Sequence, residues 1–139
     1  MVNFSAGLLM FLISVLGEGV VAQAPVLTFT ENQIDRYVAA VRSIERKREE
    51  VLRRAKNSEN WAIAVQLAET HNRDICRVPP EQQPANIRVL CRELLEFSER
   101  EIRRHGLTNR EFNQITQGLQ QDKQLQARIQ LRLLKLRNP

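Results

Sequence analysis

The chain has 139 residues, and its 21 basic and 16 acidic side chains leave a formal charge of +5. This length suits one domain, and 42% hydrophobic with 27% charged residues argues against a disordered chain. Five Gly, five Pro and 5% aromatic residues are too few for a β-sandwich, whereas the dominant Gln, Glu, Arg, Leu and Ala favour helix.

The first segment is typical of a secretory signal peptide. Its apolar run, residues 6–16, is too short to span a bilayer and fits the hydrophobic region of such a peptide. Cleavage after Ala22 is favoured, because cleavage after Ala24 would leave Pro25 directly behind the scissile bond. The competing interpretation is an uncleaved anchor, in which the carboxylate of Glu18 would lie in hydrocarbon at high cost.

Cleavage after residue 22 predicts three parts of the chain. They are a signal peptide at 1–22, a short linker at 23–29 and a single helical domain at 30–137. A protein exported in this way would reach the periplasm, the thylakoid lumen or the medium.

Two cysteines flank a proline-rich connector, and export predicts that Cys76 and Cys91 form a disulfide. A metal site completed by His71 or His105 is the first alternative, but the usual C-x-x-C and H-x-x-x-H spacings are missing. Two free thiols are the second alternative, and they would require a cytosolic protein. We therefore expect no metal site.

Residues 31–56 are predicted to form one long amphipathic helix, because apolar residues recur at spacings of three and four from Ile34 onward. Thr30 and Gln33 form a capping box at its start, and Phe29 can pack on Ile34. The opposite face is densely charged, which indicates a solvated surface with ion pairs.

Two further helices are expected on either side of the connector. The first, over 61–72, is apolar on two sides, with Trp61 on one side and Ile63 on the other. A helix with this pattern tends to lie between two neighbours. The second, over 84–105, carries one apolar stripe and ends at Gly106, a typical left-handed helix terminator.

Capping signals predict two more helices after Gly106. Leu107 can fold back on the preceding helix, and Thr108 with Glu111 forms a second capping box. Asp122 is expected to cap the last helix. Together these patterns predict an all-α fold, a small bundle of about four to five helices.

The last helix has two apolar strips. At about 100° per residue, Leu131 and Leu134 point away from the strip that contains Leu125, Ile129, Leu133 and Leu136. The second strip is either buried as well, which we favour, or meets a partner. Three basic residues lie at helical spacing nearby, so the candidates for a partner-facing surface are Leu131, Leu134, Arg128, Arg132 and Lys135.

Two segments carry a family resemblance. Residues 106–115 read GLTNREFNQI and residues 121–129 read QDKQLQARI. They resemble the patterns GLT-x-x-E-[FY]-N-x-I and Q-x-D-x-x-L-x-x-R-I of the exported, mainly cyanobacterial family called domain of unknown function 4168. The likeness extends over about 29–136 and departs from the family pattern at Lys123, where proline is usual. The resemblance implies an exported helical domain and no assigned activity.

No group of residues indicates catalysis. The carboxylates at Glu93 and Glu96 alternate with Arg92 and Arg100 at helical spacing, which is typical of a solvated, ion-paired face rather than an acid–base pair. The imidazole of His105 suits the helix C-terminus. Because phosphate-binding glycine patterns are also missing, we expect no enzyme, no catalytic residue and no cofactor.

The expected function is therefore that of a non-catalytic interaction module in the cell envelope. The alternative is a protein that binds anions or a lipid surface, since the basic excess favours anionic partners. Nucleic acid is not an expected partner of an exported protein, and membrane contact is expected only at the surface. The partner is then an unknown protein or an anionic surface.

Overall fold

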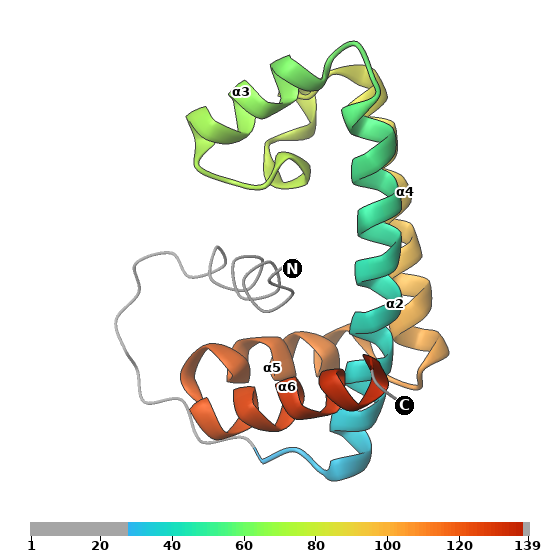
Figure 1. Ribbon diagram of the computed structural model, residues 1–139, viewed down its shortest axis with the longest axis vertical. Helices are drawn as coiled ribbons and strands as arrows, with labels where there is room; N and C mark the ends of the chain where they lie inside the picture. Colours follow the sequence, from blue (N-terminus) through green and yellow to red (C-terminus); the bar gives the residue numbers. More distant parts are fainter. Residues whose placement is uncertain (1–27, 138–139) are drawn as a thin grey trace. The chain divides into compact units, whose positions relative to one another are not determined.

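The computed structural model describes residues 28–137, which form five α-helices and two short 3-10 helices (Figure 1). No strand occurs among these residues, so the predicted all-α class with four to five helices is confirmed. The predicted signal peptide at 1–22 lies outside the described residues, as does most of the linker. Within the part that is described, no helix is long and apolar enough to cross a bilayer.

The bounds of the elements agree closely with the capping and periodicity signals. In chain order they are α2 (Glu31–Lys56), α3 (Trp61–His71), η1 (Ile75–Arg77), η2 (Pro80–Gln82), α4 (Ala85–Arg104), α5 (Asn109–Gln121) and α6 (Lys123–Arg137).

The chain divides into two compact units. Of the described residues, the first unit contains 28–40 and 102–137, and the second contains 41–101. Helices α2 and α4 each contribute residues to both units. The single domain expected at 30–137 stays a prediction.

The first unit is built from the start of α2 together with α5 and α6. Its buried side chains are Ile34, Tyr37, Val38, Ala40, Ile102, Leu107, Ile115, Leu119, Leu125 and Ile129. Tyr37 packs against Phe112 with ring centroids 4.7 Å apart, and its hydroxyl shares a 2.9 Å hydrogen bond with Thr116 Oγ1. The tyrosine thus combines a buried ring with a satisfied polar end.

The predicted capping box at the start of α2 is present. Thr30 Oγ1 accepts a hydrogen bond from the Gln33 amide at 3.1 Å, and Gln33 Oε1 accepts one from the Thr30 amide at 2.9 Å. These two bonds satisfy amide groups that a helix start leaves without intrahelical acceptors. They fix α2 at the residue where the sequence predicted it.

The corner between α4 and α5 also follows the prediction. Gly106 has a φ of 77°. The amide of Leu107 donates to the Ile102 carbonyl at 3.1 Å, and that of Gly106 donates to the Arg103 carbonyl at 2.9 Å, the two bonds of a Schellman motif. Thr108 Oγ1 then accepts from the Glu111 amide at 3.0 Å and starts α5.

The start of α6 is well capped although lysine, not proline, follows Asp122. Asp122 Oδ1 accepts hydrogen bonds from the amides of Gln124 at 2.9 Å and Leu125 at 3.2 Å. The aspartate therefore fixes this helix start without a proline at its first position.

The second unit has its own core and the predicted disulfide. The core side chains are Val51, Ala55, Ala64, Ile75, Val78, Ile87 and Leu90. Cys76 and Cys91 are bonded with their Cα atoms 5.2 Å apart, and both pack against this core. The bond joins the connector to α4.

The prediction for α3 was wrong in one respect. Trp61, Leu67 and Ala68 pack against the core of the second unit, and Ala64 is fully buried there. Ile63, expected to face a second neighbour, is 51% exposed. Helix α3 therefore packs on one side only, because an apolar pattern on a helix does not specify how many neighbours cover it.

Candidate functional site

Helix α6 carries an exposed apolar surface on the side away from the core of the first unit. Leu131 is 56% exposed and Leu134 is 54% exposed, and Ala127 is exposed beside them. We call these three residues the outward strip. The favoured prediction that Leu131 and Leu134 are buried is wrong, since Leu125 and Ile129 on the opposite side already fill the core.

Two of the predicted partner-facing residues bind inside the first unit instead. Arg128 and Arg132 both form ion pairs with Glu31 in the first turn of α2, and Arg132 Nε lies 2.9 Å from Asp35 Oδ1. These pairs join α6 to the start of α2. Helical periodicity located the arginines correctly, but it gave no signal for partners nearly a hundred residues earlier.

The remaining basic residues of α6 face solvent. Lys123, Lys135 and Arg137 are exposed, and none of them forms an ion pair with any residue between 28 and 137. Helix α6 contains five basic residues and no acidic one. The outward strip is thus an apolar surface with cationic edges.

The positive charge of the chain is concentrated in the unit that contains α6. The described part of the first unit has nine basic and four acidic residues, a net charge of +5, whereas the second unit has twelve and eleven, a net charge of +1. The four acidic residues are already engaged by arginines or helix caps: Glu31, Asp35, Glu111 and Asp122. The excess positive charge of the first unit is therefore left on groups other than these pairs.

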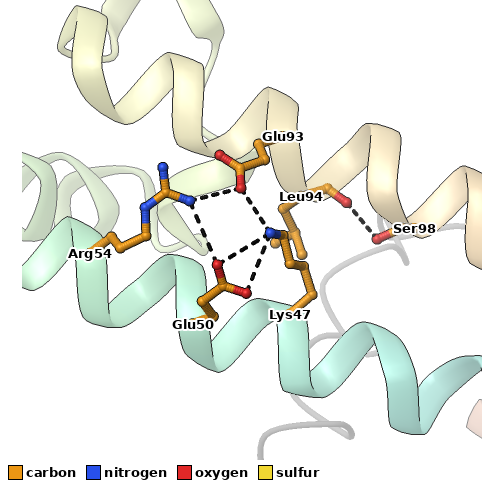
Figure 2. Close-up of polar contacts among 6 residues, drawn as sticks. All are labelled: Lys47, Glu50, Arg54, Glu93, Leu94 and Ser98. Atoms are coloured by element: carbon orange, nitrogen blue, oxygen red, sulfur yellow. Dashed lines mark hydrogen bonds and ion pairs between the residues drawn. The ribbon is translucent and has the colours of Figure 1, made fainter.

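The second unit contains a compact ion-pair cluster between α2 and α4 (Figure 2). Lys47 Nζ lies 2.8 Å from Glu93 Oε1, and Arg54 Nη1 lies 2.7 Å from the same oxygen. Glu50 contacts both cations, and Lys47 also lies over the ring of Phe97 at 5.6 Å. Hydrogen bonds from Lys47 and then Arg54 lower the pKa of Glu93.

A second cluster ties the connector to α2. Arg48 Nη2 lies 2.5 Å from Asp74 Oδ2 and its Nη1 lies 3.9 Å from Glu45 Oε2. Burial raises the pKa of Glu45, although Arg48 partly opposes the shift. In both clusters, opposite charges on neighbouring elements pair with one another and hold these elements together.

The histidine of α3 contacts the connector. His71 Nε2 lies 2.7 Å from Gln82 Oε1, across the connector. Among residues 28–137 no three His, Cys, Asp or Glu side chains are grouped where they could hold a metal ion. The expected lack of catalysis stays a prediction.

The sequence profile of a family described as domain of unknown function (DUF4168) matches residues 30–129. The chain belongs to this family. No curated protein and no solved structure matches the chain. The DUF4168 match extends from the cap of α2 to Ile129 in α6, so it includes both units.

The segment 106–115, which carries the resemblance noted in the sequence, has a structural role. Gly106 ends α4, Leu107 is buried, and Thr108 caps α5 through the Glu111 amide. These contacts account for the motif without any chemical step. The surface with unexplained features is therefore the outward strip, which lies partly beyond the matched region.

Proposed function

We propose that this DUF4168 protein is a non-catalytic interaction module of the cell envelope that docks onto a partner protein through α6. The observation that carries the proposal is the exposure of Leu131 and Leu134 on a helix whose other side packs Leu125 and Ile129 into the core. Full burial of a leucine contributes about 1.5–3 kcal/mol, and more than half of each side chain is still accessible. Covering both would therefore contribute roughly 2 kcal/mol to a complex.

The disulfide and the predicted signal peptide support a location outside the cytoplasm. Disulfides such as Cys76–Cys91 persist in oxidising compartments and are rare where thiols are kept reduced. Protein isolated from its own cells without reductant should be two hydrogens lighter than the reduced chain. A mass equal to that of the reduced chain would contradict this location.

The charged clusters support a non-catalytic role. In the Lys47–Glu93–Arg54 cluster each charge has an opposite charge within 3 Å, and the pKa of Glu93 is lowered rather than tuned toward neutrality. A general acid or base functions best with a pKa near the working pH. This arrangement suits helix pairing rather than proton transfer.

Site-specific photo-cross-linking in living cells tests the proposal. A photo-reactive amino acid replaces Gln130, which is exposed beside the outward strip, and in a control strain it replaces Gln66 on α3. We expect one recurrent protein adduct from position 130, and no such adduct from position 66. Leu131→Glu with Leu134→Glu should abolish the adduct while the helix content stays unchanged.

Two outcomes would contradict the proposal. In one, position 130 yields no recurrent adduct in living cells. In the other, the leucine substitutions unfold the protein, which would show that the strip serves the fold.

The basic character of α6 supports a second candidate, binding to an anionic lipid surface. In that case the protein should co-sediment with vesicles that contain acidic lipids at low salt and detach at high salt, because ions screen the attraction. Binding that is unaffected by salt would exclude this candidate.

A further inference from the structure

We propose that the outward strip of α6 binds an amphipathic helix of the partner, and that the residues flanking the apolar seam of that helix are acidic. This inference rests on the function proposed above and names the kind of partner that the same surface accepts. Two features of α6 carry it: the spacing of the exposed apolar residues and the sign of the charges beside them.

The spacing of the outward strip suits helix pairing. Ala127, Leu131 and Leu134 follow one another at intervals of four and three residues, and all three are exposed. This i, i+4, i+7 arrangement lets one helix present apolar residues along a single line to another helix. In heptad terms Leu131 takes position a, and Ala127 and Leu134 take position d. A second helix laid along α6 would fit its own apolar side chains between them.

The flanking positions select the partner by charge. With Leu131 at a, the e and g positions of α6 fall at 123, 128, 130, 135 and 137. Four of these residues are basic and the fifth is Gln130. Arg128 already pairs with Glu31, whereas Lys123, Lys135 and Arg137 have no ion pair among the described residues. Acidic residues at the facing positions of a partner helix would supply the missing counter-charges.

Two other occupants fit this surface less well. A second copy would bring two sets of basic flanks together, and like charges across an interface disfavour pairing. A helix that binds a lipid surface needs a broad apolar face. In α6 the apolar side chains of Leu125 and Ile129 are buried in the core. The apolar residues exposed outside it are Ala127, Leu131, Leu134 and, off the strip, Leu136, too few for such a face.

The test uses the purified protein and two synthetic helical peptides of three heptads each. Both peptides have Leu at a and d, one has Glu at every e and g position, and the other has Lys there. Each peptide repels its own copies, so both remain available for binding. At low salt we expect the Glu peptide to bind at least about tenfold more tightly than the Lys peptide, and this difference should shrink at high salt. Titration calorimetry measures both affinities.

Three variants test which residues of α6 bind the peptides. Lys123→Glu with Lys135→Glu should reverse the preference, so that the Lys peptide becomes the tighter ligand. Misfolding would weaken binding, so it cannot explain such a gain. Leu131→Gln with Leu134→Gln should remove binding of both peptides. The matched control Leu95→Gln alters a leucine of α4 that is 60% exposed, and it should bind like the unaltered protein.

Several results would overturn the inference. Two of them concern the peptides: equal affinity for both, or a preference for the Glu peptide that persists in the Lys123→Glu, Lys135→Glu variant. The other two concern different occupants: a dimer of the protein that depends on Leu131, or tighter binding to acidic vesicles than to the Glu peptide. If neither peptide binds but photo-cross-linking at position 130 still recovers a partner, the acidic helix is excluded and the proposed function stands. If cross-linking fails as well, both fall.

Discussion

Gly106 shows how much one residue can fix at the corner between α4 and α5. Its φ of 77° lies in the left-handed region that residues with a Cβ avoid. Arg36 Nη1 donates a hydrogen bond to the Gly106 carbonyl oxygen at 3.1 Å, and a Cβ added to the glycine would lie 2.7 Å from that nitrogen. The position is therefore restricted both in conformation and in space.

We expect Gly106→Ala to lower the free energy of unfolding by about 1–2 kcal/mol, the cost of a side chain in the left-handed conformation. Urea unfolding followed by circular dichroism measures the change. The loss should persist in an Arg36→Ala background, where the neighbouring side chain is gone but the backbone strain remains. Full recovery in that background would show that the conflict is purely steric.

Two carboxyl groups of the second unit make the stability of the fold depend on pH in opposite directions. The pKa of Glu93 is lowered from its ordinary 4.5 by hydrogen bonds from Lys47 and Arg54, so its stabilising effect is complete above pH 4.5 and is lost as the pH falls through the lowered pKa. Burial raises the pKa of Glu45 from the same ordinary value. The folded state then binds the extra proton, and stability falls as the pH rises from 4.5 through the raised pKa.

Substitution of each carboxyl should therefore change the pH profile with a different sign. Glu93→Gln should be less stable than the unaltered protein near about pH 7, and the difference should close as the pH falls below 4.5. Glu45→Gln should gain stability relative to the unaltered protein as the pH rises above 4.5. Urea unfolding at a series of pH values measures both, and two parallel profiles would contradict the assignment.

At the scale of elements, the connector between α3 and α4 is held from several sides. Asp74 Oδ1 accepts from the Cys76 amide at 3.0 Å while its other oxygen pairs with Arg48 of α2. The buried Gln83 donates to the carbonyls of Ile75 at 2.9 Å and Val78 at 2.7 Å. The disulfide adds a covalent bond to a segment that these contacts already hold.

We expect Cys76→Ser with Cys91→Ser to lower the free energy of unfolding by about 3 kcal/mol, because the unfolded chain regains the freedom that the closed loop removes. Thermal unfolding with and without reductant measures the effect. Reductant should destabilise the unaltered protein and leave the double variant unchanged. Equal stability of both proteins without reductant would contradict this role for the disulfide.

The helix ends could be predicted because their signals are local. Thr30 with Gln33, Thr108 with Glu111, and Asp122 each bond within three residues along the chain, so a short stretch of sequence contains both partners. Gly106 ends α4 for the same reason. The predicted bounds of α2, 31–56, agree with the structure at both ends.

What could not be predicted depends on distant residues. Periodicity identified two strips on α6, but only the packing of Leu125 and Ile129 decides that Leu131 is left outside. The pairing of Arg128 with Glu31 joins residues 97 positions apart, and neither residue carries a local sign of the other. The sequence therefore located the candidate site on α6 correctly. It was wrong about the burial of the leucines, and it did not reveal the ion-pair partners of the arginines.

At the scale of the molecule, the unequal charge of the two units predicts whether copies of the protein associate with one another. The first unit has a net charge of +5 over its described residues, and the exposed basic residues of α6 border its apolar strip. Like charges on two approaching copies repel, which opposes contact through the strip. We therefore expect charge to oppose pairing of this exposed apolar surface with itself.

We therefore expect the purified protein to be a monomer in low salt. Sedimentation equilibrium at low and high ionic strength measures this, since screening weakens the repulsion. Lys123→Glu with Lys135→Glu removes part of the positive charge and should raise the tendency to dimerise. A stable dimer of the unaltered protein at low salt would contradict the argument.

The division of the chain also determines the order in which it can fold during synthesis. The second unit is continuous, so all of its core residues exist once residue 101 has been made. The first unit joins 28–40 to 102–137, and its core cannot close before Leu125 and Ile129 have been made. Until then the apolar side chains at the start of α2 stay uncovered on the growing chain. The earliest residues of the fold are thus among the last to reach their native contacts.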